Sequence, residues 1–253
     1  MRGVLDLLLC SLLMPVLILP RHYRVRLVQI LLEREERRGS PREVLRFLLA
    51  VEDVLVRSLD RAAMAYGAGT HPKHRLTGYH EFFIMHTPPG ARVLDVGCGT
   101  GELSADIAAQ VPGSQVTGVD ILPERIEAAF ARRSLPNLRF IRADILHDTV
   151  EGKFDVVVLS NVLEHLDARV ELLRRLRQKT GARRFLVRVP LYERHWTIPL
   201  RQELGLAFFS DPTHRVEHTQ EQIRAELEAA GLQVVTQEVR WGECWLVAEG
   251  TDG

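Results

Sequence analysis

Short apolar runs alternate with stretches of helical spacing over the last two thirds of the chain. The runs occupy residues 93–96, 115–119, 138–141, 154–159 and 184–189. The run at 154–159 is apolar at nearly every position, which is typical of a strand buried on both faces of a parallel sheet. Strands that alternate with helices predict an α/β fold. Two more strands are expected at residues 232–239 and 244–249.

The first part of the chain follows a different pattern. Residues 4–19 are almost wholly apolar, but Asp6 and Pro15 interrupt this run, and it is shorter than the ~20 residues that a spanning helix needs. No small-residue cleavage site of a signal peptide follows it. Basic and apolar residues alternate over 21–28, an arrangement that suits the surface of an anionic membrane. We therefore predict peripheral membrane contact through residues 4–28, with packing on protein or in a homo-oligomer as the alternative.

A second helix is expected after Gly39. Ser40, Pro41 and Glu43 form a helix start, in which Ser is the N-cap and Glu the third helical residue. Apolar residues then recur at spacings of three and four up to Ala62, and such a stripe predicts packing rather than ligand binding. We divide the chain into an N-terminal helical appendage, residues 1–69, and a second domain, residues 70–253.

The chemistry of the second domain centres on the turn after its first strand. Gly97, Gly99 and Gly101 follow this strand, and a helical stretch begins at residue 102. Glycines let the backbone approach a ligand closely, and the helix start presents unpaired N–H groups. The spacing is G-x-G-x-G, with Asp95 two residues before the first glycine, whereas dinucleotide-binding folds carry G-x-G-x-x-G.

Acidic residues end the next two strands. Asp120 lies 19 positions after Gly101, where a carboxylate can accept hydrogen bonds from two ribose hydroxyls. Asp144 follows the third strand. Before the first strand, residues 71–83 gather cations, imidazoles and aromatic rings, with Tyr79 among them. We expect this segment to meet a charged group of the ligand.

These motifs, together with the segment Asn161-Val162-Leu163-Glu164-His165-Leu166 after the fourth strand, resemble those of class I S-adenosylmethionine (SAM) dependent methyltransferases. The similar branch includes ubiquinone-biosynthesis-type, glycan and small-molecule methyltransferases. The resemblance covers roughly residues 70–250. It implies a Rossmann-like, seven-stranded, mostly parallel sheet with an antiparallel last strand, and SAM as the cofactor. The residues expected to bind SAM are Asp95, Gly97, Cys98, Gly99, Gly101, Asp120, Ile121, Ala143, Asp144, Ile145, Asn161 and Tyr79.

Composition narrows the possible partners and the compartment. The chain has 33 basic and 33 acidic residues and no net charge, so a general nucleic-acid partner is not predicted. Its three cysteines lie far apart and form neither a zinc pattern nor a disulfide framework. That usage indicates a reducing compartment. We expect a cytoplasmic protein, placed at the inner face of the membrane if residues 4–28 contact lipid.

Three histidines are candidates for a general base. SAM itself supplies the reactive methyl group, so the protein has to align it with the acceptor and help remove the acceptor's proton. His165 is the first candidate because it follows strand four, and His195 and His214 lie in the long irregular stretch 190–218. Some ubiquinone-type relatives bind a divalent metal with two acids and this first histidine. Asn161 replaces the first acid here, so no metal is predicted.

We expect methyl transfer, most simply to oxygen, on a small molecule, a sugar or a lipid-linked precursor. Two alternatives stay open. One is a non-catalytic SAM-binding or scaffold protein, in which helices over residues 21–65 serve as the interaction module. The other is an NAD-dependent Rossmann enzyme, against which the glycine spacing counts. A protein or RNA methyltransferase is disfavoured because strand four is not followed by an N/D-P-P-Y type of motif.

Overall fold

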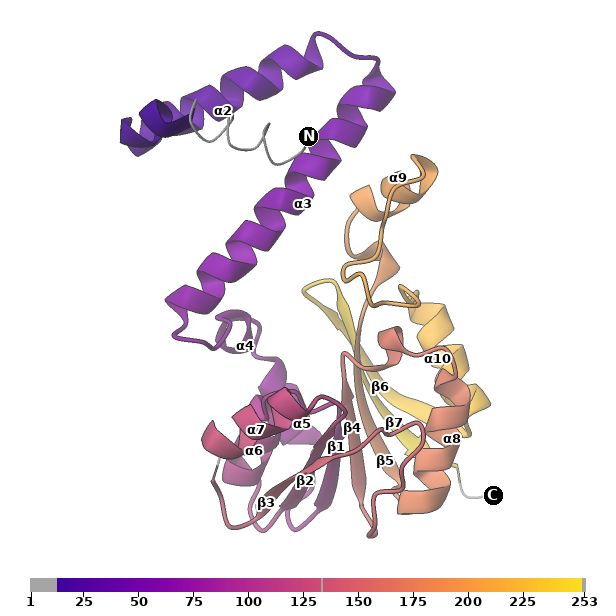
Figure 1. The fold of residues 1–253 in the computed structure, drawn as a ribbon. Coiled ribbons are helices and arrows are strands. Elements are labelled where there is room, and N and C mark those ends of the chain that lie inside the picture. Colours follow the sequence, from indigo (N-terminus) through magenta and orange to yellow (C-terminus); the bar gives the residue numbers. More distant parts are fainter. Residues whose placement is uncertain (1–12, 133, 252–253) are drawn as a thin grey trace. The chain divides into compact units, whose positions relative to one another are not determined.

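The computed structural model describes residues 13–132 and 134–251 (Figure 1). Its contacts divide the chain into two units, Met1–Ala63 and Met64–Gly253. The boundary that the sequence places between residues 69 and 70 stays a prediction. Residues 4–12 of the predicted membrane segment lie outside the described residues.

The first unit is helical. Helix α2 spans Arg21–Glu36 and α3 spans Pro41–Tyr66, which continues into the second unit. The predicted helix start is confirmed, because the Ser40 N–H donates to Glu43 Oε2 at 2.9 Å and the Glu43 N–H donates to Ser40 Oγ at 3.4 Å. Many apolar side chains of this unit are exposed. Across the described residues, no helix has both the length and the apolar character to cross a membrane.

The second unit is built on one seven-stranded sheet in the order β3-β2-β1-β4-β5-β7-β6. Strands β1 to β5 run parallel to one another, and β7 runs antiparallel between β5 and β6. This topology confirms the predicted Rossmann-like fold and its antiparallel last strand. The strands are β1 Arg92–Val96, β2 Gln115–Asp120, β3 Leu138–Arg142, β4 Val156–Ser160, β5 Arg184–Pro190, β6 Leu232–Arg240 and β7 Glu243–Gly250.

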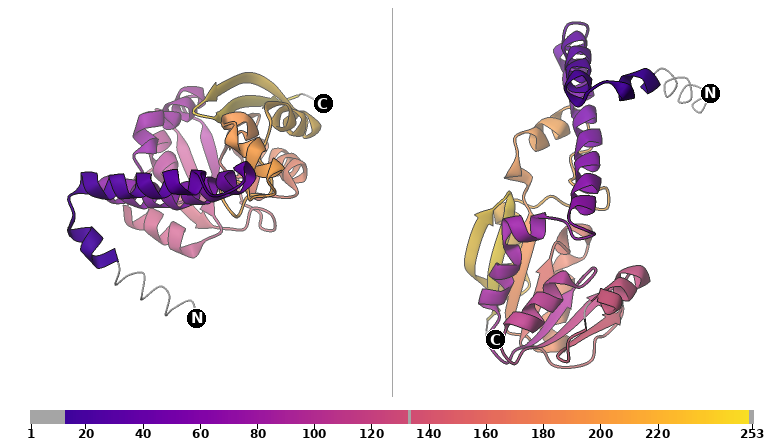
Figure 2. Two further views of the ribbon diagram at one scale, coloured as in Figure 1. Left: turned by 90° about the horizontal axis from the view of Figure 1, so that it is seen from above. Right: turned by 90° about the vertical axis from the view of Figure 1, so that its left-hand side faces the viewer.

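Helices cover both faces of this sheet (Figures 1 and 2). On one face α5, α6 and α7 pack over β1, β2 and β3, and on the other α8 and α10 pack together. Short α4 precedes α5, and Gly78 (φ 65°) separates the two. The bounds are α4 Lys73–Thr77, α5 Tyr79–His86, α6 Glu102–Gln110, α7 Pro123–Arg132, α8 Arg169–Thr180, α9 Thr197–Glu203 and α10 Gln220–Ala229.

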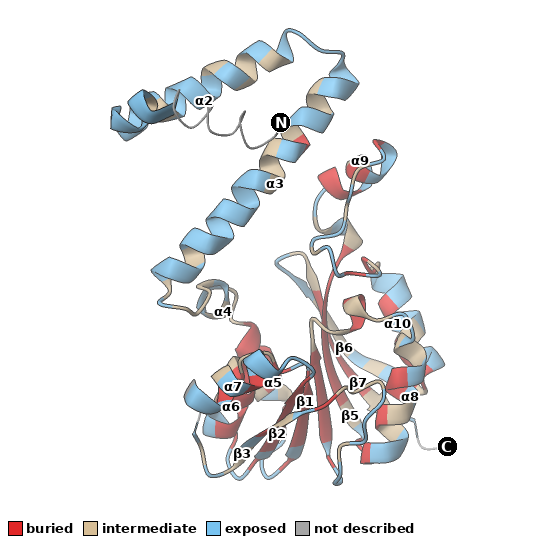
Figure 3. Cartoon of the chain, in the orientation of Figure 1, coloured by how far each residue is buried: buried red, intermediate tan, exposed pale blue. Residues whose placement is uncertain are grey.

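Burial on both faces explains the continuous apolar pattern of the central strand. In β4, Val156 and Val158 belong to the core under α5 and α6, while Val157 and Leu159 belong to the core under α8 and α10. All four side chains are at most 1% exposed. The central strands are correspondingly the most uniformly buried elements in Figure 3, whereas the edge strands β3 and β6 are buried only in part. The sheet is therefore a rigid base, and its loops at the carboxyl ends of the strands carry the variable chemistry.

The segments after β4 and β5 contain short helical turns. After β4, Leu163–His165 form a 3₁₀ turn, η1, and helix α8 begins only at Arg169. The stretch 190–218, expected to be irregular, contains the 3₁₀ turn η2 (Tyr192–Arg194) and helix α9. Thr219 forms a capping box at the start of α10: the Gln222 N–H donates to its hydroxyl at 3.1 Å, and the Gln222 side chain accepts from the Thr219 N–H at 2.9 Å.

Candidate functional site

The glycine turn between β1 and α6 is closely packed around Gly97 and Gly101 and open around Gly99. Gly97, Gly99 and Gly101 have φ of 68°, 58° and 81°, a region that side chains rarely adopt. A Cβ on Gly97 would lie 2.7 Å from Val162, and one on Gly101 2.5 Å from the Phe140 ring. Around Gly99 a Cβ would meet nothing within 4 Å. The turn therefore presents the Gly99 side of its backbone to a ligand.

Asp120 fixes this turn to the end of β2. Its carboxylate accepts the Gly99 N–H at 3.0 Å through Oδ2 and the Leu122 N–H at 2.9 Å through Oδ1. The Arg125 guanidinium lies 3.6 Å from Oδ2. A carboxylate has about four acceptor positions, so these two backbone bonds leave room for two hydroxyl donors.

A cleft of about 360 Å³ opens at the carboxyl ends of β1 and β4. A volume of this size suits a small-molecule ligand. Six of the residues predicted to bind the cofactor line it, namely Tyr79, Asp95, Gly97, Cys98, Gly99 and Asn161. Lys73, Arg125 and Arg188 bring positive charge to its wall, and Asp95 and Glu102 bring carboxyl groups. Groups of both signs suit a zwitterionic ligand such as an amino acid.

Arg188 organises one wall of the cleft. Its guanidinium lies 3.6 Å from the centroid of the Tyr79 ring, and its Nε donates to Asn161 Oδ1 at 3.1 Å. Asn161 directly follows β4, and its backbone has a positive φ of 56°. Burial raises the pKa of Tyr79 to about 12 against the opposing charge of Arg188, so the ring keeps its phenol proton.

A chain of hydrogen bonds leads from Tyr79 towards the surface. Its hydroxyl lies 2.8 Å from His74 Nδ1, which in turn lies 3.1 Å from His80 Nε2. His80 Nδ1 contacts Asp106 Oδ2 at 2.5 Å. Burial and the charge of His80 lower the pKa of His74 to about 4, so this imidazole is neutral at physiological pH. The chain holds the segment before β1 against α6, at the edge of the cleft.

Asp95 is buried beneath the turn. Ser104 donates a hydrogen bond of 2.5 Å to its Oδ2. Burial nevertheless raises the pKa of Asp95 to about 7, with the neighbouring Asp120 acting in the same direction. A positively charged ligand group in the cleft would favour the ionised form of this carboxyl.

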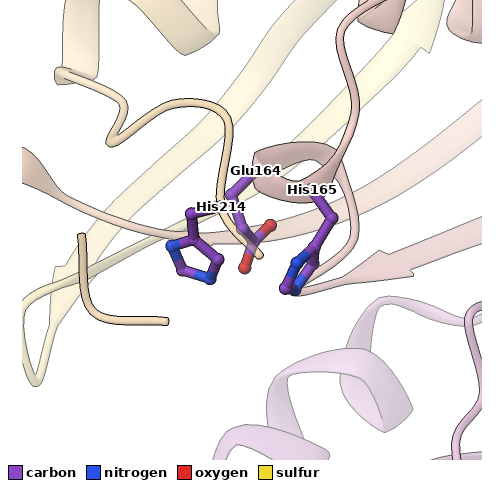
Figure 4. A group of neighbouring side chains, drawn as sticks. All are labelled: Glu164, His165 and His214. Atoms are coloured by element: carbon purple, nitrogen blue, oxygen red, sulfur yellow. The ribbon is translucent and has the colours of Figure 1, made fainter. Parts of the chain in front are cut away.

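Beyond Asn161, the turn η1 brings together Glu164, His165 and His214 (Figure 4). One ligand atom from each of the three lies within 4.8 Å of the others. Glu164 is fully buried, and among the described residues nothing donates a hydrogen bond to either of its carboxyl oxygens. Burial raises the pKa of Glu164 to about 8, with the positive charge of Arg188 opposing the shift. The two rings lie edge to face with centroids 4.6 Å apart.

The loop that carries His214 is tied to η1 and to its own segment. The Arg215 N–H donates to the Glu164 carbonyl at 2.7 Å. Glu217, whose side chain is fully buried, accepts from Arg194 at 2.5 Å and from the Ser210 N–H at 2.6 Å, and it contacts His214 Nδ1 at 3.1 Å. Burial opposes the charge of Glu217, but the bonds from His214 and Ser210 lower its pKa below the usual value. These contacts place His214 beside η1.

The remaining residues predicted to bind the cofactor or to act as a base have the following positions. Ala143 follows β3, and its N–H donates to the Asp120 carbonyl at 3.1 Å. Asp144 accepts the Leu146 N–H at 2.9 Å, and Ile145 packs against the core under α8. Ile121 is exposed. His195 is not part of the histidine group: its Nδ1 lies 2.7 Å from Thr197 Oγ1 at the start of α9.

Two important residues were not predicted as site residues. Arg188 could have been found from the sequence, because it is a cation inside the apolar run of strand five. Glu217 has no such signal: it lies three residues after His214, but its burial and its ion pair with Arg194 depend on the fold of the segment 190–218.

Comparison with known proteins places this arrangement in a family. A family model described as a methyltransferase domain matches residues 69–237. The ribosomal protein L11 methyltransferase of Burkholderia mallei is 39% identical over 113 residues, or 45% of this chain and 36% of that protein. The same enzyme of Ralstonia pickettii is 40% identical over 121 residues, or 46% of this chain and 38% of that protein. The chain thus spans little more than a third of the length of these relatives.

Solved structures share the fold at low sequence identity. Magnesium protoporphyrin IX methyltransferase from Synechocystis, with bound S-adenosylhomocysteine (SAH), has a TM-score of 0.54 at 21% identity over 69% of this chain and 83% of its own. A SAM-dependent methyltransferase from Aquifex aeolicus has a TM-score of 0.57 at 16% identity over 78% of this chain and 98% of its own.

Proposed function

The chain belongs to the methyltransferase family whose model it matches and is a SAM-dependent enzyme, and from this premise we propose that it methylates an oxygen atom of a small molecule, a sugar or a lipid-linked precursor. The observation that carries the proposal is the juxtaposition of two sites. A cleft with groups of both charges adjoins, through Asn161, a group of one buried carboxyl, one buried imidazole and one half-buried imidazole.

The cleft suits the methionine part of SAM. Its ammonium group would meet Asp95 and its carboxylate would meet cations of the wall such as Arg188. The two free acceptor positions of Asp120 would take the ribose hydroxyls, and Asp144 with Ala143 and Ile145 would border the adenine. In this arrangement the backbone at Gly99 faces the ligand without a side chain in the way.

The acceptor would bind between η1 and the segment 190–218. This segment offers aromatic surface, since Phe208 and Phe209 stack with centroids 4.6 Å apart and Trp196 is exposed. His165 and His214 would act on the acceptor hydroxyl, with His195 as a more distant candidate. Aromatic faces beside imidazoles and carboxyl groups suit a polar molecule that carries hydroxyls.

The reaction forms one bond and breaks one. The acceptor oxygen attacks the methyl carbon of SAM while the carbon–sulfur bond breaks, and its electron pair stays on the sulfur of SAH. The hydroxyl proton leaves to the group at η1 and then to water. Because SAM carries the activated methyl group, alignment of oxygen, carbon and sulfur accounts for most of what the protein has to supply.

Calorimetric binding of SAM and SAH to the purified protein tests the cofactor site. We expect one equivalent of each to bind, and an acceptor screen then follows SAH release with hydroxylated small molecules, sugars and lipid-linked sugars. Ribosomal proteins belong in the same screen, because relatives named for a ribosomal protein match part of this chain. Binding of SAH without release in any acceptor pool would favour the non-catalytic alternative.

We also propose that the protein is cytoplasmic and touches the inner face of the membrane through residues 4–28. In the described part of this segment, Ile18, Tyr23 and Val25 are exposed, and Arg21, Arg24 and Arg26 alternate with them. Apolar and basic side chains together are what anionic lipid surfaces bind. Self-association through the same surface, in a homo-oligomer, is the competing proposal.

A further inference from the structure

The side chain of Glu164 poses an electrostatic problem. Its carboxyl group is fully buried, and no described residue donates a hydrogen bond to it. A buried polar group without a partner destabilises the folded state, and a charged one does so more strongly. The nearest polar side chains in its group are the imidazoles of His165 and His214 (Figure 4).

The hydrogen bonds of the two imidazoles determine which nitrogen of each ring carries the proton and which is free to bind a metal. The Thr213 hydroxyl donates to Asp211 Oδ1 at 2.5 Å, so its oxygen accepts from His165 Nδ1 at 2.8 Å. Glu217, which is held by Arg194 and the Ser210 N–H, accepts from His214 Nδ1 at 3.1 Å. Both Nδ1 atoms are therefore hydrogen-bond donors. In each neutral ring, Nε2 is then unprotonated and carries a lone pair.

Three acceptors thus converge without a donor among the described residues: the Glu164 carboxylate and the Nε2 atoms of two imidazoles. One proton satisfies only a single pair of them, whereas a metal ion satisfies all three together. We propose that Glu164, His165 and His214 bind one divalent transition-metal ion.

The ligand set indicates the class of metal. Two imidazoles and one carboxylate match the ligands of catalytic zinc sites and of open non-haem iron sites. Magnesium and calcium instead prefer oxygen ligands. Histidines bound to metals typically donate their second N–H to a carboxylate or another oxygen. Here Glu217 and Thr213 fill those outer positions. Zn²⁺, Mn²⁺ or Fe²⁺ therefore fit better than Mg²⁺.

The third ligand explains why the asparagine at 161 does not exclude a metal. Asn161 is used elsewhere, in its bond to Arg188. His214 comes from the segment between β5 and α10, and the bond between the Arg215 N–H and the Glu164 carbonyl brings it to η1. Resting on the proposed function, His165 and His214 would then act on the acceptor hydroxyl as metal ligands rather than as bases, and the metal would bind that hydroxyl and make it more acidic.

The test measures metal binding apart from activity. Chelator-treated full-length protein is titrated with Zn²⁺ by calorimetry, and the metal content of freshly purified protein is measured by mass spectrometry. We expect one equivalent to bind, with at least roughly tenfold weaker binding in Glu164→Gln and His214→Gln. His195→Gln removes a histidine of the same segment outside the group, and it should bind as the wild type does.

SAH binding separates this inference from the proposed function. Wild type and variants should bind SAH equally, which shows that they are folded and that the cofactor site is intact. His165→Gln, at a half-buried position, is the substitute if either buried variant fails to bind SAH. The proposed metal site is wrong if wild type binds SAH but takes up no stoichiometric Zn²⁺. It is also wrong if the variants at Glu164, His214 and His165 bind Zn²⁺ as tightly as wild type. Failure to bind SAH would instead overturn the proposed function.

Discussion

The carboxylate of Asp120 has two tasks, one in the protein and one towards SAM. It holds the Gly99 and Leu122 N–H groups, and in our proposal it also accepts the ribose hydroxyls. Asp120→Asn removes the negative charge and replaces one carboxylate oxygen by an NH₂ group. This NH₂ group is a donor and cannot accept hydrogen bonds from the backbone N–H groups or the ribose hydroxyls. Because bonds to a charged acceptor contribute about 1.5–3 kcal/mol each, we expect the Kd for SAH to rise at least roughly tenfold in calorimetry.

The control for this prediction is Asp155→Asn. Asp155 forms an exposed ion pair with Arg92 at 3.0 Å at the other end of the strands, so its loss should leave the Kd for SAH unchanged. Equal Kd values for Asp120→Asn and wild type would remove Asp120 from the binding site.

A second prediction concerns pH and Asp95. Its pKa is raised from the ordinary value to about 7 in the folded protein, so the folded state binds a proton that the unfolded state releases. The resulting stabilisation is complete below the unfolded pKa and is lost as the pH rises through about 7. Without SAM, the free energy of unfolding of wild type should fall from pH 5 to pH 8 by more than that of Asp95→Asn.

The size of this difference should be on the order of a few kcal/mol. Denaturant unfolding of both proteins at the two pH values measures it, and the comparison cancels the other titrating groups that the two proteins share. Parallel pH profiles for wild type and Asp95→Asn would mean that the carboxyl is not held in its neutral form.

At the scale of elements, the junction of β1 and α6 depends on glycine for steric reasons. We predict that Gly101→Ala lowers the free energy of unfolding by about 2–4 kcal/mol, because the new Cβ meets the Phe140 ring at 2.5 Å and φ is 81°. Gly90→Ala is the matched control, since φ is 75° there but nothing lies within 4 Å of the new Cβ. Its cost should stay near 1 kcal/mol. Equal costs in thermal unfolding would show that backbone strain alone matters.

Regular elements of the second unit could be predicted from the sequence because their signals are local. The apolar run of β4, the glycine spacing after β1 and the Thr219 cap each depend on neighbouring residues. The histidine group could be predicted only in part. His165 follows a recognisable strand, but His214 reaches it through Arg215 and Glu217, whose partners lie far away in sequence. Contacts between residues so far apart in the sequence cannot be predicted from local sequence patterns.

At the scale of the whole molecule, the first unit is predicted to bring the enzyme to anionic lipid. Full-length protein should sediment with vesicles that contain an anionic phospholipid, and a variant without residues 1–20 should stay in the supernatant. Replacing Arg21, Arg24 and Arg26 by Gln should weaken binding roughly 100-fold, at about 1 kcal/mol for each basic residue near the surface. Vesicles of neutral lipid are the control.

The truncated protein must still bind SAH for this comparison to hold. If it then sediments like the full chain, residues 1–20 are not the membrane contact, and the apolar side chains of this unit serve self-association instead. Size-exclusion chromatography of the two proteins would distinguish a homo-oligomer from a lipid-binding monomer.

The order of strands also determines when this protein can finish folding on the ribosome. Strand β7 is synthesised after all the others, yet it inserts between β5 and β6. Its Trp245 is fully buried and packs against Phe82, with ring centroids 5.6 Å apart. Until residues 243–250 have emerged, the nascent chain carries β5 as an open sheet edge, the kind of surface on which aggregation starts. Translation that stalls before this point therefore leaves an incomplete sheet that is a natural substrate for chaperones.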